Sequence, residues 1–113
     1  MKTLNFSKFH GFGNDYIVID AASLEAGTDL PQLASAICDR HIGAGADGIA
    51  VVERLDGTDA DYHCEIVNPD GSIAGFSGNG TRCAAAYLHY SGTWQAADLR
   101  LRTRSGIKRY QLT

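Results

Sequence analysis

Residues 68–90, NPDGSIAGFSGNGTRCAAAYLHY, decide the fold, because they combine a turn, a short strand, a glycine-rich corner and a helix. Residues 68–71 (NPDG) match a β-turn, with proline in the second position and glycine in the fourth. After the corner at residues 77–80 comes an uninterrupted apolar run, Cys83 to Leu88. A helix that is apolar on every side must be wrapped by other elements, so we expect this helix to be the buried centre of the fold.

The start of this helix has a distinct chemistry. The first N–H groups of a helix lack acceptors within it and carry roughly half a unit of positive charge. Gly78 and Gly80 have no Cβ, so a carboxylate or phosphate group could approach the backbone there, with the Ser77 hydroxyl at the rim. A tight corner that needs glycine for its own geometry would explain the same pattern. The spacing leaves both interpretations open.

The remaining segments predict an α+β fold. Asp29 is suited to cap an amphipathic helix that ends near residues 40–42, before Gly43. Strands are predicted at residues 4–9, 16–19, 49–52, 60–67, 72–76, 99–104 and 107–112. Most of these strands follow one another directly, which favours a mainly antiparallel sheet that curls, or closes into a barrel, around the central helix.

Composition and charge argue against several function classes. A length of 113 residues allows a single domain over residues 1–113, and a formal net charge of −3 gives no support for nucleic-acid binding. The sequence has neither a signal-peptide pattern nor an apolar run of the ~20 residues that a membrane span requires. Three cysteines, an odd number, predict buried thiols rather than a disulfide framework. A cytoplasmic location is therefore the default expectation.

Two motifs match known catalytic or cofactor sites only in part. Residues 43–48 (GAGADG) fit the glycine pattern of dinucleotide-binding proteins, but they follow a helix and precede a strand, which is the wrong order. The residues around Ser77 do not match the nucleophile elbow of serine hydrolases, because Asn79 stands where that motif has its second glycine. The cysteine and histidine spacings do not make a four-ligand zinc set, so no metal is expected.

Three asparagines lie at glycine or proline corners. Asn14, Asn68 and Asn79 each fit turn formation, which needs no ligand. Together they could equally present amide donors and acceptors to a polar ligand. The residue types alone do not decide between these interpretations.

Four motifs in order resemble the N-terminal half of diaminopimelate epimerase. They are residues 10–15 (HGFGND), 39–48 (DRHIGAGADG), 68–72 (NPDGS) and 77–83 (SGNGTRC). The resemblance implies conversion of LL-diaminopimelate to the meso form, on the route to lysine and peptidoglycan, without pyridoxal phosphate, metal or other cofactor. It also implies two similar halves, each a sheet around a central helix, with the active site between them.

The resemblance also assigns roles to individual residues. Asn14 and Asn68 would contact the amino-acid substrate, and the helix start, Gly78, Asn79 and Gly80, would bind its carboxylate. The family uses one catalytic cysteine from each half, and in this half the position immediately before Gly-Asn-Gly is that cysteine.

The sequence departs from the family at that position, which holds Ser77. Serine is a much weaker acid than cysteine, so it is a poor base at neutral pH without an activating partner. Cys83 lies further along the helix and is not expected to substitute for it.

Several explanations for the serine stay open. The chain could be an epimerase half-site that is inactive or weakly active alone, with the serine natural or introduced to trap a complex. It could be a non-catalytic homologue that binds an amino acid. It could be related to hydroxyproline epimerases or dehydratases, which carry serine or threonine at one such position. Because the sequence stops within a hairpin pattern, we expect a missing C-terminal half, or a second copy in a homodimer, to complete the site.

Overall fold

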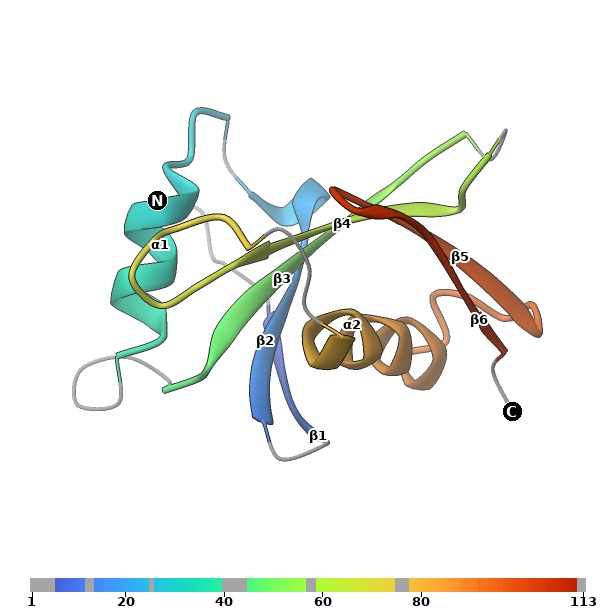
Figure 1. Ribbon diagram of the computed structural model, residues 1–113, viewed down its shortest axis with the longest axis horizontal. Helices are drawn as coiled ribbons and strands as arrows, with labels where there is room; N and C mark the ends of the chain where they lie inside the picture. Colours follow the sequence, from blue (N-terminus) through green and yellow to red (C-terminus); the bar gives the residue numbers. More distant parts are fainter. Residues whose placement is uncertain are drawn as a thin grey trace.

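The computed structural model describes residues 6–11, 14–24, 26–39, 45–56, 59–74 and 78–111. Within these ranges the chain has an α+β architecture with one six-stranded sheet (Figure 1). The strands follow each other across the sheet in chain order: β1 (Phe6–Gly11), β2 (Asn14–Asp20), β3 (Gly48–Arg54), β4 (Tyr62–Val67), β5 (Asp98–Thr103) and β6 (Gly106–Gln111). The helices are α1 (Leu30–Ile37), α2 (Gly78–Tyr90) and a short 3-10 helix, η1 (Ala21–Ser23).

The sheet is mixed, so the prediction of a mainly antiparallel sheet is not confirmed. The pairs β1–β2, β3–β4 and β5–β6 are antiparallel. The pairs β2–β3 and β4–β5 are parallel. The parallel pairs arise because α1 and α2 are crossovers, which return the chain to the end of the sheet where the preceding strand began.

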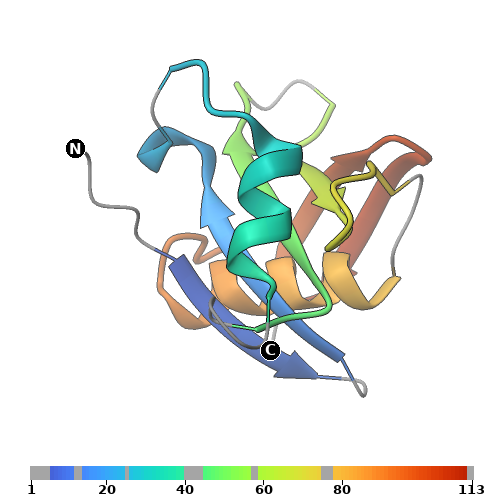
Figure 2. The same ribbon diagram turned by 90° about the vertical axis from the view of Figure 1, so that its left-hand side faces the viewer.

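The two helices lie on opposite faces of the sheet, as Figures 1 and 2 show. Strands β2 and β4 run in opposite directions, because β3 is parallel to β2 and antiparallel to β4. Both crossovers step the same way across the sheet. Right-handed crossovers that leave from oppositely directed strands therefore place their helices on opposite faces.

Each face of the sheet has its own hydrophobic core. In β2 the core residues alternate between the faces, since Tyr16 and Val18 pack toward α2 whereas Ile17 and Ile19 pack toward α1. This confirms the strand predicted at residues 16–19 and shows that it is buried on both faces. The α2 side also contains Val52, Tyr62, Cys64, Leu88, Leu99 and Leu101, and the α1 side Ala34, Ile49, Val51 and Val67.

Helix α1 begins as predicted but ends earlier. The Asp29 carboxylate caps its N-terminus. The helix stops at Ile37 rather than near residues 40–42. The N–H groups of Gly45 and Ala46 donate to the carbonyls of Ile37 and Cys38 at 3.1 and 3.2 Å, so these carbonyls bond to a later segment instead of to a further helical turn.

Helix α2 is buried along one side, so the predicted complete wrapping is not confirmed. Cys83, Ala84 and Leu88 are buried against the sheet, whereas Arg82 is exposed and Tyr90 is 76% exposed. The sheet arches over the buried side of α2 in Figure 1. Strands β1 and β6 are its two edges, so the predicted closure into a barrel is not seen among the described strands.

The turn predicted at residues 68–71 is confirmed. The Gly71 N–H donates to the Asn68 carbonyl at 2.8 Å, and Gly71 has a φ of +91°, which favours glycine. The strand predicted at residues 72–76 is reduced, in its described part, to a single bridge between Ile73 and Val67.

Candidate functional site

The first turn of α2 contains Gly78, Asn79 and Gly80, the residues expected to bind a carboxylate. Gly80 is buried, and Gly78 and Asn79 are half-buried. Thr81, only 1% exposed, donates from its hydroxyl to the Gly78 carbonyl at 3.1 Å. The Tyr110 hydroxyl donates to Thr81 Oγ1 at 2.7 Å, so β6 anchors this turn. Ser77 lies outside the described residues.

The starts of β2 and β3 and the end of β4 meet at one end of the sheet. The register pairs Tyr16 with Gly48 and Ile49 with Val67. Asn14 begins β2 and Asn68 follows β4 directly. With strands about 4.8 Å apart and about 3.3 Å per residue, the Cα atoms of the two asparagines lie roughly 12 Å apart.

Asn68 belongs to a turn that is held by its own hydrogen bonds. Its amide group donates to Ser72 Oγ at 3.0 Å. The Ser72 hydroxyl and N–H both donate to the Asp70 carboxylate, at 2.6 and 2.9 Å. These hydrogen bonds lower the pKa of Asp70. Turn formation therefore accounts for Asn68 structurally, and its contact with a substrate stays a prediction.

The structure defines the position of Asn14 through the strand pairing of its backbone. This residue pairs with Gly11, the last residue of β1, and its side chain lies outside the described part of the structure. The neighbouring Asp15 is close enough to Cys83 to act on it: burial, and then the negative charge of Asp15, raise the pKa of the Cys83 thiol. The start of β2 therefore lies near the first turns of α2.

Asp47 and Gly48 have structural roles that the sequence analysis missed. Asp47 Oδ2 accepts the Asp15 N–H at 2.8 Å, and the Asp47 N–H donates to the Asp15 carbonyl at 2.8 Å. A Cβ on Gly48 would lie 2.8 Å from Tyr16 Cε1 and 3.1 Å from the Val67 carbonyl oxygen. Both residues join the starts of β2 and β3. Their only signal in the sequence was membership of the motif at residues 39–48.

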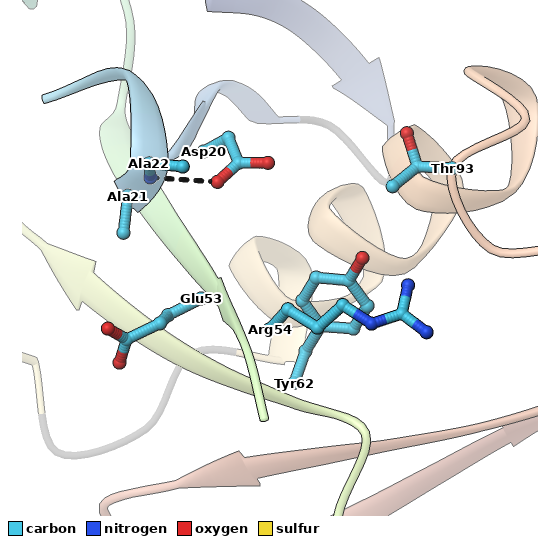
Figure 3. A pocket seen from close by; sticks show the side chains of 7 residues that line it. All are labelled: Asp20, Ala21, Ala22, Glu53, Arg54, Tyr62 and Thr93. Carbon is cyan, nitrogen blue, oxygen red and sulfur yellow. Dashed lines mark hydrogen bonds between the residues drawn. The ribbon is translucent and has the colours of Figure 1, made fainter. Parts of the chain in front are cut away.

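A pocket of about 410 Å³ lies at the opposite end of the sheet (Figure 3). It is formed by the ends of β2 and β3, the start of β4 and the segment that follows α2, and its polar lining residues are Asp20, Glu53, Arg54, Tyr62 and Thr93. None of the residues expected to bind substrate lines it. The sequence analysis missed this pocket because its walls come from four separate segments.

The described ranges contain no group of three or more His, Cys, Asp and Glu side chains arranged to hold a metal ion. None of the helices in these ranges has the length and apolarity that a membrane-crossing helix needs. Cys38, Cys64 and Cys83 are buried and form no disulfide bond, as predicted.

Comparison with known sequences identifies one family. A sequence model described as diaminopimelate epimerase matches residues 6–113. A diaminopimelate epimerase of Pelotomaculum thermopropionicum is 42% identical over 105 residues, which covers 92% of this chain and 37% of that protein. One of Caldanaerobacter subterraneus is 43% identical over 104 residues, covering 92% and 36%. The chain thus spans little more than a third of the length of these relatives.

Solved structures with a similar fold have much lower sequence identity. A PhzF-family phenazine biosynthesis protein of Enterococcus faecalis matches with a TM-score of 0.70 at 14% identity, over 89% of this chain and 35% of its own. A hydroxyproline epimerase of Agrobacterium vitis, with bound trans-4-hydroxy-L-proline, matches with a TM-score of 0.68 at 19% identity, over 96% and 37%. At these identities the likeness establishes the fold alone.

Proposed function

This chain belongs to the diaminopimelate epimerase family, and we propose that it forms the N-terminal half of a cofactor-independent epimerase that converts LL-diaminopimelate to the meso form, a step toward lysine and peptidoglycan. The observation that carries the proposal is the glycine-led start of α2, at the end of the sheet where β2 starts and β4 ends. The relatives are nearly three times as long as the matched region, so they contain a further part that could complete the site.

The start of α2 suits the charge that develops during epimerisation. Removal of the Cα proton moves negative charge onto the substrate carboxylate. N–H groups fixed at the helix start would stabilise that charge without having to reorganise. Gly78 and Asn79 would donate from the backbone, and Gly80, which has no Cβ, would let the carboxylate approach closely.

The two asparagines would hold the rest of the substrate. Asn14 starts β2 and Asn68 follows β4, on either side of β3. An amide offers both a donor and an acceptor, so each can bond to a substrate ammonium or carboxylate group. Their separation of roughly 12 Å by strand spacing leaves room for an amino acid between them.

Ser77 occupies the position of the catalytic cysteine, and Cys83 does not replace it. Cys83 is 2% exposed, and burial together with the charge of Asp15 raises its pKa, so the thiol stays protonated at neutral pH. The Ser77 hydroxyl can return or relay a proton but is a poor proton acceptor. We therefore expect little or no epimerase activity from this chain alone.

The same serine favours a second candidate, a homologue that binds an amino acid without catalysis. Binding of a carboxylate by the start of α2 needs no base, so replacement of cysteine by serine would leave it intact. A relative of hydroxyproline epimerases or dehydratases with serine at the catalytic position is a further alternative. The similarity to the Agrobacterium vitis enzyme supports its fold only.

Proton exchange at Cα tests the proposal. This chain is joined to the remaining part of the Pelotomaculum thermopropionicum relative and incubated with LL-diaminopimelate in heavy water, and loss of the Cα–H signal is followed by NMR. We expect no loss above a no-protein control with Ser77, and clear loss with Ser77→Cys. Ser77→Ala in the same fusion is the matched control and should behave like the original serine.

Each outcome separates the candidates. Exchange by the isolated chain as a strict monomer would contradict the two-half site. Retained substrate binding without exchange in the Ser77→Cys fusion would favour the binding homologue. Gel filtration with mass detection addresses the homodimer: a monomer at every concentration excludes a site rebuilt from two copies of this chain.

A further inference from the structure

The pocket at the end of the sheet where α2 finishes has no role in the proposed epimerase site. Its volume of about 410 Å³ is in the range of pockets that bind small molecules. Asp20 and Arg54 line it together with the hydroxyl-bearing side chains of Tyr62 and Thr93. Glu53 lines it as well, but Glu53 lies between Val52 and Arg54 in β3, so strand alternation directs its side chain to the other face of the sheet. On the α2 face, one carboxylate and one guanidinium suit a ligand that carries both charges.

Strand register places the two opposite charges on the same face of the sheet. Asp20 pairs with Val52, and Arg54 lies two residues further along β3, opposite Tyr62 of β4. Val52 and Tyr62 pack toward α2, so alternation assigns Asp20 and Arg54 to that face as well. By strand spacing their Cα atoms are about 8 Å apart, close enough for one small molecule to contact both side chains.

Two aromatic rings support the Arg54 guanidinium. Its central carbon lies 5.8 Å from the ring centroid of Tyr62 and 5.4 Å from that of Trp94. The two rings meet edge to face, with centroids 6.1 Å apart. Cation–π contact fixes a guanidinium through its face and leaves the N–H groups at its edge for a carboxylate. Among the described residues no carboxylate forms a salt bridge with Arg54, although the positive charge of Arg54 helps to lower the pKa of the neighbouring Asp61.

Asp20 presents one carboxylate oxygen to the pocket. Its Oδ1 accepts the Ala22 N–H at 2.9 Å, at the start of η1. Figure 3 shows the other oxygen turned away from η1, toward the side on which Arg54 and Thr93 lie. Thr93, in the segment that follows the end of α2 at Tyr90, contributes a hydroxyl group to the lining of the same pocket. A carboxylate oxygen and a hydroxyl oxygen can both accept hydrogen bonds from an ammonium group.

We propose that this pocket binds a free amino acid or a zwitterion of similar size. The ligand ammonium bonds to Asp20, and the ligand carboxylate bonds to Arg54. This site is separate from the proposed epimerase site, because it lies at the other end of the sheet and holds the carboxylate with a side chain instead of with backbone N–H groups.

The single tryptophan of the chain, Trp94, reports on the pocket, because its ring lies against the Arg54 guanidinium. Its fluorescence is followed while the chain is titrated with L-alanine, L-alanine amide or N-acetyl-L-alanine. We expect a saturable change with L-alanine. The amide lacks the carboxylate and the acetyl derivative lacks the ammonium, so each should bind at least about tenfold more weakly, as loss of one charge-assisted hydrogen bond requires. These two probes use the unaltered chain.

Variants locate the binding. Arg54→Gln and Asp20→Asn should each weaken L-alanine binding at least about tenfold, and the second keeps an acceptor for the Ala22 N–H. Arg104→Gln is the matched control, because Arg104 pairs with Glu65 elsewhere on the sheet and its loss should leave binding unchanged. The proposal is overturned if all three probes bind equally, if neither pocket variant weakens binding, or if Asn68→Ala abolishes the response.

Discussion

The two ends of the sheet present polar groups in different ways. Where α2 begins, glycines and a turn present backbone N–H groups, and charged side chains bond to the backbone, as Asp47 does to the Asp15 N–H at 2.8 Å. Where α2 ends, Asp20 and Arg54 project from strands beside aromatic rings. A site built from backbone is sensitive to any added Cβ, whereas a site built from side chains is sensitive to loss of a single charge. Four predictions follow this contrast, in order of decreasing effect.

Leu88→Ala should have the largest effect, because it removes a fully buried side chain from the core on the α2 side of the sheet. Leu88 is fully buried in the core between α2 and the sheet. Deletion of a buried leucine side chain lowers the free energy of unfolding by about 2–5 kcal/mol. Urea unfolding measures the loss, and Tyr90→Ala, at a position that is 76% exposed on the same helix, should be nearly neutral. Equal losses for the two variants would contradict the assigned burial of α2.

Gly48→Ala should destabilise the end where α2 begins by about 1–3 kcal/mol, because the added Cβ would press on Tyr16 and on the Val67 carbonyl. Gly92, after α2, is required for a different reason. It has a φ of +75° and open space around its Cα. Asparagine tolerates positive φ, so Gly92→Asn should cost much less than Gly48→Asn. Equal melting temperatures for the two asparagine variants would refute this distinction.

Tyr110→Phe should lower the free energy of unfolding by about 1 kcal/mol, because it removes the hydrogen bond of 2.7 Å to Thr81. Thr81 itself bonds to the Gly78 carbonyl, so this contact links β6 to the first turn of α2. A double-mutant cycle with Thr81→Val isolates the pair. Additive losses in that cycle would mean that β6 does not anchor the start of α2.

The loss of folding stability at low pH should be the smallest effect. Its physical cause should differ between the two ends of the sheet. Burial alone would raise the pKa of Asp61, but hydrogen bonds from Arg100 and its positive charge outweigh burial and lower it. A carboxyl with a lowered folded-state pKa stabilises the fold above its unfolded pKa, and that stability is lost as the pH falls through the folded value. The wild-type chain should therefore lose about 0.5–1 kcal/mol of stability through Asp61 as the pH falls below the ordinary carboxyl pKa of about 3.9, and Asp61→Asn should abolish this part of the acid dependence.

Added salt distinguishes the acid effect of Asp61 from that of Asp70, which lies at the other end of the sheet. Asp70 also has a lowered pKa, but its cause is hydrogen bonding from the uncharged Ser72. Added salt should shrink the acid effect of Asp61, which depends on the charge of Arg100, and leave that of Asp70 unchanged, because salt screens charge–charge attraction. Unfolding at two salt concentrations, with Asp61→Asn and Asp70→Asn, tests this. A salt response in Asp70 alone would reverse the assignment.

Local sequence patterns located most elements of the fold. Residues 16–19 were predicted as a strand from an unbroken apolar run, the α1 cap from Asp29, and the turn at residues 68–71 from Pro69 and Gly71, because each pattern is satisfied by neighbouring residues. The end of α1 was wrong, since it depends on hydrogen bonds from Gly45 and Ala46, which approach from later in the chain.

The two ends of the sheet also differ in whether their residues are neighbours in the sequence. The start of α2 was apparent in the sequence because Gly78, Asn79 and Gly80 are consecutive. The pocket was not, because Asp20 and Arg54 are brought together only by the parallel pairing of β2 with β3. The Asp15–Asp47 contact was missed for the same reason.

The sequence by itself determined the family, the N-terminal cap of α1, the turn at residues 68–71 and the glycine-led start of α2, because these depend on residue identity and short-range spacing. Only the tertiary structure decided that the sheet is mixed, that α1 and α2 cover opposite faces, and that two distinct polar ends result. These properties follow from the direction and handedness of each crossover, and a local pattern of apolar and polar residues is the same whichever neighbour a strand pairs with.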